Sequence, residues 1–218
     1  MPRVNVAIAM GVPGGDLDYM ATGGVRYAVE MSQRYFDGPN AGIWLFFREP
    51  VRIPGPDAAG LAEWVDDWLS REAGVDSYRG VRKNNSVSGV LKKMRKSGAW
   101  GLTISLVLNE IIDATADLPG HTVAVVVLTQ SPDDGAEFIA TMRRAARYPV
   151  FWVFLGADAS HEHVAHLGVV DTLGERPEDP DNFLILKTDT WTSEFGQWWM
   201  SRRIRRAVSR WQRLTPIG

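Results

Sequence analysis

A glycine-rich turn follows the first apolar stretch of the chain, where an α/β protein often keeps its functional residues. The stretch Val4–Met10 leads into Gly11, Gly14 and Gly15. A phosphate-binding P-loop needs a lysine followed by serine or threonine after its last glycine, and this turn has neither. A Gly-x-Gly-x-x-Gly dinucleotide-binding pattern is also missing. The turn therefore gives no support for nucleotide binding, and we expect no cofactor.

A histidine cluster at 161–166 offers nitrogen ligands for a metal. His163 and His166 are three residues apart, so one helical face could present both, with Asp158 or His161 completing a zinc site. The spacing matches none of the familiar zinc patterns, and an exposed polar loop explains the cluster equally well. Zinc binding here is the weaker alternative.

Paired aspartates could hold a cation at the strand ends. Asp16 and Asp18 follow the first turn, and Asp133 and Asp134 precede a predicted helix. Loop solvation explains both pairs without a metal, and favourable charge at a helix N-terminus is a further explanation for Asp133 and Asp134. The chain has no cysteine and no Gly-x-Ser-x-Gly elbow. We therefore expect a protein that is not an enzyme.

The net charge of −2 conceals two basic stretches that contain no acidic residue. Such patches can attract nucleic acid or a phosphorylated ligand even on a weakly acidic protein. Anion binding is therefore an alternative function. The first stretch consists of Arg79, Arg82, Lys83, Lys92, Lys93, Arg95 and Lys96, and the second lies within 202–213.

The last predicted helix combines tryptophans with arginines. An apolar stripe through Ile204 and Val208 can dock on a sheet, while the opposite face is basic. A solvated basic face is one interpretation, and a surface that binds a partner is the other. In the second, Trp198 and Trp199 anchor the base of the helix, and Trp211 reaches the partner. The predicted partner-binding residues are Trp198, Trp199, Arg202, Arg206, Arg210 and Trp211.

Apolar strands alternate with helical patterns along the chain. This order predicts an α/β fold: one doubly wound, mostly parallel sheet with helices on both faces. A single domain over 1–192, with a long amphipathic helix at 193–218 as part of it, accounts for the length. The expected strands are 4–10, 43–47 continuing toward 53, 122–128, 150–155, 169–170 and an edge strand at 183–186. The expected helices are 25–36, one that Asp57 caps, 102–116, 132–147, 161–167 and one from Ser193 to Leu214.

Targeting signals are weak in this sequence. No apolar run reaches the roughly 18 to 20 residues of a membrane-spanning helix, and the N-terminus lacks a basic and then apolar leader. The lack of cysteine also fits a cytoplasmic protein. We expect that location.

Several segments resemble a known family. Tyr148–Gly156 (YPVFWVFLG) and Asp181–Leu184 (DNFL) are similar to segments of von Willebrand factor A (vWA) domains, especially those of bacterial tellurium-resistance (Ter) proteins. Leu128–Gln130 stands within the place of the family's Phe-Ile-Thr-Asp-Gly segment, with Gln130 at the aspartate, and Ser193–Trp199 stands at its final helix. The order of the predicted elements is similar too.

The resemblance implies a place for a metal-ion-dependent adhesion site. In vWA domains an Asp-x-Ser-x-Ser turn, a threonine and a later aspartate hold a divalent cation, as hard oxygen ligands do. Met10, Val12 and Gly14 stand at the turn positions, Gln130 at the aspartate position and Thr103 at the threonine position. The anionic oxygens are missing, so the resemblance predicts a degenerate site without metal.

Together these observations favour a non-enzymatic protein-interaction or scaffold module on a vWA-like fold. Its setting would be a stress-response system or a larger assembly such as a phage particle, with proteins as partners. Two alternatives remain. One is binding of nucleic acid or a phosphoryl ligand through the basic stretches, and the other is a metal-dependent hydrolase or adhesion domain with relocated ligands.

Overall fold

The centre of the structure is a six-stranded sheet with the strand order β3-β2-β1-β4-β5-β6. The computed structural model describes residues 4–11, 19–36, 40–46, 48–53, 55, 102–156, 167–176, 179–187 and 193–215. Neighbouring strands are parallel except β3, which pairs antiparallel with β2. The predicted doubly wound, mostly parallel sheet is therefore confirmed. The strands are β1 (Val4–Gly11), β2 (Gly42–Phe46), β3 (Pro50–Ile53), β4 (His121–Leu128), β5 (Val150–Gly156) and β6 (Phe183–Lys187).

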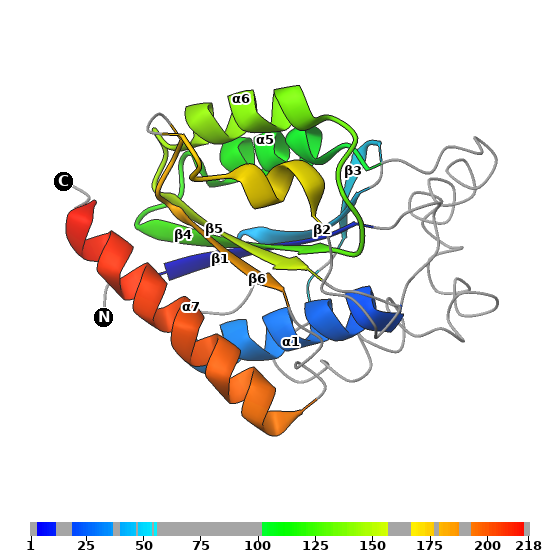
Figure 1. Ribbon diagram of the computed structural model, residues 1–218. Coiled ribbons are helices and arrows are strands. Elements are labelled where there is room, and N and C mark those ends of the chain that lie inside the picture. The colour runs from blue at the N-terminus through cyan, green and yellow to red at the C-terminus, as the bar shows by residue number, and fades with distance from the viewer. Residues whose placement is uncertain are drawn as a thin grey trace.

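Helices cover both faces of this sheet, as the alternating pattern predicts (Figure 1). Helices α1 (Tyr19–Tyr35) and α7 (Glu194–Leu214) lie on one face. Helices α5 (Ile104–Thr115) and α6 (Gly135–Ala145) lie on the other, together with the short 3₁₀ helix η3 (Gly168–Thr172). The described residues contain no helix whose length and apolarity would let it cross a membrane.

The three central strands are buried along their whole length. Every residue of β1, β4 and β5 is buried, which is typical of parallel strands covered on both faces. Bulky side chains fill the space beneath the helices: Trp152 on β5 is fully buried, and Phe138 of α6 meets Phe154 edge-on. This rigid core fixes the ends of the strands and the docking of the outer helices.

Within the described residues, the structure differs from the predicted elements in three places. Helix α1 begins at Tyr19, earlier than the predicted start at Val25. The expected strand at 169–170 is the 3₁₀ helix η3, in which Val170 N–H donates to Leu167 O and Leu173 N–H donates to Val170 O. These local bonds, with Gly168 at φ +55°, replace pairing with a neighbouring strand. The expected continuation of the second strand toward Ile53 reverses after Phe46 and forms the antiparallel edge strand β3.

Other predicted elements are confirmed. Strand β6 forms the edge of the sheet beside β5, and Ser193 caps α7 by accepting a hydrogen bond from Gly196 N–H at 3.1 Å. The predicted helix that Asp57 caps and residues 161–166 of the next one lie outside the described residues.

Candidate functional site

The carboxyl end of β1 lies where ligands commonly bind in doubly wound sheets. The chain runs from β1 to β2 and β3 on one side of β1, and then returns to place β4 on the other side of β1. The strand order therefore reverses at β1. Met10 sits in register with Val127 of β4 and Leu45 of β2. Of the predicted metal-site positions, Met10, Thr103 and Gln130 are described, and Val12 and Gly14 lie outside the described residues.

Apolar side chains occupy the end of β1. Met10 is fully buried. Gly11 follows it, and a Cβ atom on Gly11 would lie 2.9 Å from Leu102 Cδ1 and 3.5 Å from Phe46 Cζ. Leu102 is held there because its backbone bridges to Pro132 and its carbonyl accepts from Asp133 N–H at 2.8 Å. The described carboxyl end of β1 is therefore packed by hydrocarbon side chains, which supply no ligand for a hard cation.

Asp134 lies four residues after Gln130, and its carboxylate binds backbone amides and no metal ion in the described contacts. Asp134 accepts hydrogen bonds from Ile104 N–H (3.0 Å) and Ser105 N–H (2.8 Å), so both of its oxygens cap the N-terminus of α5. Thr103, the N-cap residue of α5, makes no side-chain cap bond. Asp134 is also the N-cap residue of α6, so its charge lies at the start of that helix as expected, but its side chain makes no capping hydrogen bond there.

Within the described ranges, no three His, Asp or Glu side chains gather closely enough to hold a metal ion. Asp133 and Asp134 therefore do not form a relocated cation site with a third ligand from those ranges. Asp16, Asp18 and the histidine-cluster residues lie outside them, as does the first basic stretch. The predicted residues concerned are Asp158, His161, His163 and His166, and Arg79, Arg82, Lys83, Lys92, Lys93, Arg95 and Lys96.

Helix α7 docks on the sheet through one side. Met200, Ile204 and Val208 are buried, as the apolar stripe predicts. Trp211 is also buried, with its ring 5.5 Å from Phe151 of β5 and edge-on to His121 of β4 at 4.8 Å. The predicted role of Trp211 in reaching a partner is therefore wrong, because that side chain belongs to the interface between α7 and the sheet.

Large aromatic side chains lie on the outer side of the same helix. Phe195 is 74% exposed, Trp198 50% and Trp199 39%. We call these three residues the aromatic cluster. The expectation that Trp198 and Trp199 anchor the helix base stays a prediction, because both rings are only partly exposed and Trp198 also lines the cavity beside α1. Phe195 was missed by the sequence analysis, although its position three residues before Trp198, off the apolar stripe, could have indicated it.

Guanidinium groups stack on these rings. Arg202 Cζ lies 5.2 Å from the centre of the Trp198 ring, and Arg203 Cζ lies 4.7 Å from that of Trp199. Stacking of this kind holds a long side chain in place and leaves the edge of its guanidinium free to donate hydrogen bonds. Further along the helix Arg206, Arg210 and Arg213 are exposed. We call Arg202, Arg206, Arg210 and Arg213 the arginine row.

A cavity of about 420 Å³ lies between α1 and the start of α7. Its lining includes Met31, Tyr35 and Trp198, with Glu30 and Glu194 contributing carboxylates. At its base, Tyr27 Oη lies 3.0 Å from Ser201 Oγ. Burial raises the pKa of Tyr27 to about 12, against the opposing effect of the Ser201 hydrogen bond. The phenol is therefore neutral at physiological pH and serves to join the two helices.

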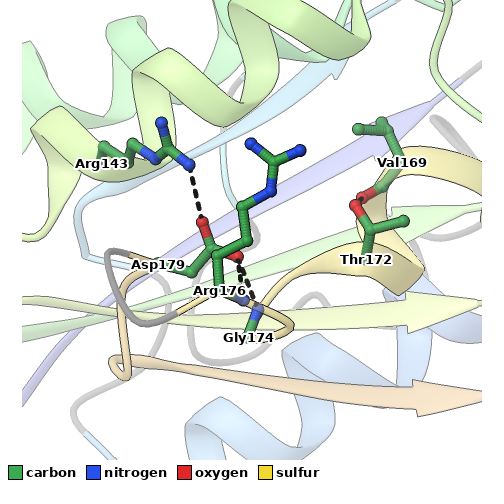
Figure 2. Close-up of polar contacts among 6 residues, drawn as sticks. All are labelled: Arg143, Val169, Thr172, Gly174, Arg176 and Asp179. Atoms are coloured by element: carbon green, nitrogen blue, oxygen red, sulfur yellow. Dashed lines mark hydrogen bonds and ion pairs between the residues drawn. The ribbon is translucent and has the colours of Figure 1, made fainter.

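A second polar cluster, around Asp179, serves to fix a loop (Figure 2). The Asp179 side chain is 2% exposed and receives Arg143 Nη2 at 3.1 Å on one oxygen. Its other oxygen accepts from Gly174 N–H (3.3 Å) and Arg176 N–H (3.2 Å). Burial favours a raised pKa, but these hydrogen bonds and the Arg143 charge outweigh it, so the pKa of Asp179 is lowered. Each oxygen of the Asp179 carboxylate has a protein partner, so we infer that this cluster stabilises the loop.

Comparison with known proteins gives a structural likeness only. No protein-family model matches the sequence, and no curated protein matches it. Among solved structures, the chain is similar to manganese-loaded TRAP protein of Plasmodium vivax, with 10% sequence identity and a TM-score of 0.46. That match covers 84% of this chain and 68% of the other. We therefore argue the function from this chain's own residues.

Proposed function

We propose that this protein is a non-enzymatic protein-interaction module that docks a partner on the outer side of α7. The observation that carries the proposal is the aromatic cluster beside the arginine row, on a helix whose other side is buried against the sheet. Exposed tryptophan and arginine are enriched where proteins bind one another, and a few such residues usually supply most of the binding energy.

The packing at the end of β1 supports a module that works without a metal. Buried Met10 and the Leu102 side chain supply hydrocarbon where a cation would need anionic oxygens. The carboxylate of Asp134 is already occupied by two amides of α5. In this proposal the scaffold is a vWA-like domain with a degenerate adhesion site, and binding has moved from the strand ends to α7.

The resemblance to Ter-associated vWA domains suggests a setting for such a module. A scaffold role in a stress-response system, or as a subunit of a larger assembly such as a phage particle, would use a rigid α/β body that presents one docking face. The segments Tyr148–Gly156 and Asp181–Leu184 carry that resemblance.

The proposal is tested by recovering partners from the native cells with tagged protein. We expect a partner to copurify in near-stoichiometric amount with the parent and to be lost from a variant with Trp198→Ala and Trp199→Ala. Arg147→Ala is the matched control, because Arg147 is exposed in the turn that follows α6, a helix on the opposite face of the sheet. Equal recovery by parent and double variant would contradict the proposal.

Anion binding is the second candidate, and the charge of α7 favours it. The helix has six exposed arginines after Glu194 and no further acidic residue. If phosphates are the ligands, affinity for a short DNA duplex should fall steeply between about 50 and 200 mM salt. A measured affinity that is weak and does not change with salt would dismiss this candidate.

A further inference from the structure

We propose that the partner element is an acidic amphipathic helix that lies along α7 and inserts an apolar side chain into the cavity between α1 and α7. This inference rests on the proposed function and specifies the chemistry of its partner. It uses three features: the geometry of the arginine row, the stacked guanidinium groups and the position of the cavity.

Three members of the arginine row share one line along the helix with Phe195, while Arg210 lies to one side of it. Arg202, Arg206 and Arg213 follow Phe195 by 7, 11 and 18 residues, which are close to two, three and five helical turns. At 1.5 Å per residue, this line is about 27 Å long. A partner helix of about 18 residues would match it, with an apolar residue opposite Phe195 and acidic residues along the remainder.

The charge of this line has no internal compensation in the part of the chain that the structure describes. Its ion pairs join Arg26 to Glu30, Arg143 to Asp179 and Lys187 to Asp171, and none involves α7. Arg206, Arg210 and Arg213 are therefore exposed cations without a described acidic partner. An acidic surface laid on them would gain attraction at every turn and would be steered toward the site.

The stacked arginines favour carboxylates over nucleic-acid bases. Arg202 and Arg203 each cover one face of a tryptophan ring, the surface on which a base would otherwise stack. A guanidinium that lies over a ring in this way still presents a fork of N–H donors along its edge. That fork matches the two oxygens of a carboxylate, so glutamate or aspartate side chains are suitable ligands.

The cavity gives the apolar end of the partner a place to bind. Trp198 forms part of its apolar wall, and Met31 and Tyr35 of α1 form another part. Glu30, Arg34, Glu194 and Gln197 line its polar part. A volume of about 420 Å³ accommodates a leucine or phenylalanine side chain. The ring centres of Phe195 and Trp198 lie 5.9 Å apart at the start of α7. An apolar side chain of the partner bound there would therefore be followed along α7 by the arginine row.

A designed peptide tests this chemistry. The probe is a fluorescent 18-residue helical peptide with leucine in its first turn and glutamates along one face at three- and four-residue spacing, made in both sequence directions. We expect one direction to bind the parent with micromolar affinity by fluorescence anisotropy, and the glutamine analogue to bind at least about tenfold more weakly.

Charge exchange provides the sharper comparison. A variant with Arg206→Glu and Arg213→Glu should lose about tenfold in affinity for the glutamate peptide and gain affinity for a lysine analogue. Arg147→Glu is the matched control and should bind like the parent. Trp198→Ala should weaken binding of the leucine peptide more than that of a peptide with alanine at the anchor position.

The outcomes separate this inference from the proposed function. The acidic-helix inference would be overturned if neither peptide direction binds, or if the glutamate and glutamine peptides bind equally. It would also be overturned if the protein binds oligo(dT) or phosphatidylserine vesicles more tightly than the peptide. If the native partner still depends on Trp198 and Trp199, the interaction module itself stands. If native capture ignores those residues, the proposed function fails as well.

Discussion

At the scale of single residues, three of the described aspartates complete backbone hydrogen bonding. Asp134 caps α5, Asp179 gathers the loop before β6, and Asp171 accepts from Leu167 N–H and pairs with Lys187. Each of these roles joins segments distant in the chain or closes a turn. Neighbouring aspartates that look alike in sequence can therefore have different importance.

Asp134→Ala should destabilise the protein by about 2 kcal/mol, because two amides of α5 lose a charged acceptor. Asp133→Ala, which removes the exposed neighbouring carboxylate, should cost less than about 0.5 kcal/mol. Urea unfolding of the parent and both variants measures the difference. Equal midpoints for the two variants would show that Asp134 does not support α5.

Asp179→Asn should lower the melting temperature at neutral pH, because the lowered pKa of Asp179 means that the folded state favours the charged form. That contribution is complete above the pKa of the unfolded chain and is lost as pH falls through the lowered pKa of the folded chain. The melting-temperature gap between parent and variant should therefore shrink in acid. Asp181→Asn, at an exposed neighbouring position, is the control. A gap that is constant or grows in acid would contradict this account.

At the scale of elements, α7 has a buried side and an exposed side. The side with Ile204, Val208 and Trp211 packs on the sheet, and the side with the aromatic cluster faces outward. Tyr27 joins this helix to α1 through Ser201. Because α7 is held along its length, the outer side chains start from a rigid base, which reduces the entropy lost when a partner binds.

Trp211→Ala should destabilise the protein by roughly 3 kcal/mol, because it empties a buried aromatic site beside Phe151 and His121. Trp199→Ala, on the outer side of the same helix, should change stability by less than about 1 kcal/mol. Thermal unfolding of both variants makes the comparison. A larger loss for Trp199→Ala would mean that the two sides of α7 have been exchanged.

Much of the fold could be predicted because its central strands carry long apolar patterns. The β-branched residues of β4 are suited to a strand that is buried on both faces. The apolar stripe of α7 can be buried only if that side of the helix packs on the sheet. The orientation of individual tryptophans could not be predicted, since Trp198, Trp199 and Trp211 share one helix and differ only in angle around it. The partner of Asp134 was equally inaccessible, because α5 begins 30 residues earlier in the chain.

At the scale of the whole molecule, the sheet separates two layers of helices, and the proposed docking surface belongs to the layer of α1 and α7 (Figure 1). The end of β1, where doubly wound proteins commonly bind ligands, is packed with apolar side chains instead. In the proposed function, a partner binds the outer side of α7, and the packed end of β1 serves stability.

Millimolar Mg²⁺ or Mn²⁺ should leave the melting temperature unchanged if no native cation site exists. A cation at a hundredfold excess over its Kd, bound only to the folded state, would add about 2.7 kcal/mol. Calcium-free buffer with chelator is the reference condition. A clear rise in melting temperature, abolished by Asp16→Ala or Asp133→Ala, would contradict the claim of a degenerate site.

The most direct test of the account measures partner affinity and stability together for Trp198→Ala and Trp211→Ala. The partner is the protein recovered from native cells, and binding is measured by calorimetry well below both melting temperatures. We expect Trp198→Ala to weaken binding by about 2 kcal/mol, roughly thirtyfold, with little change in melting temperature. Trp211→Ala should melt earlier and bind like the parent while folded. Parent-like affinity in Trp198→Ala would contradict docking on the outer side of α7.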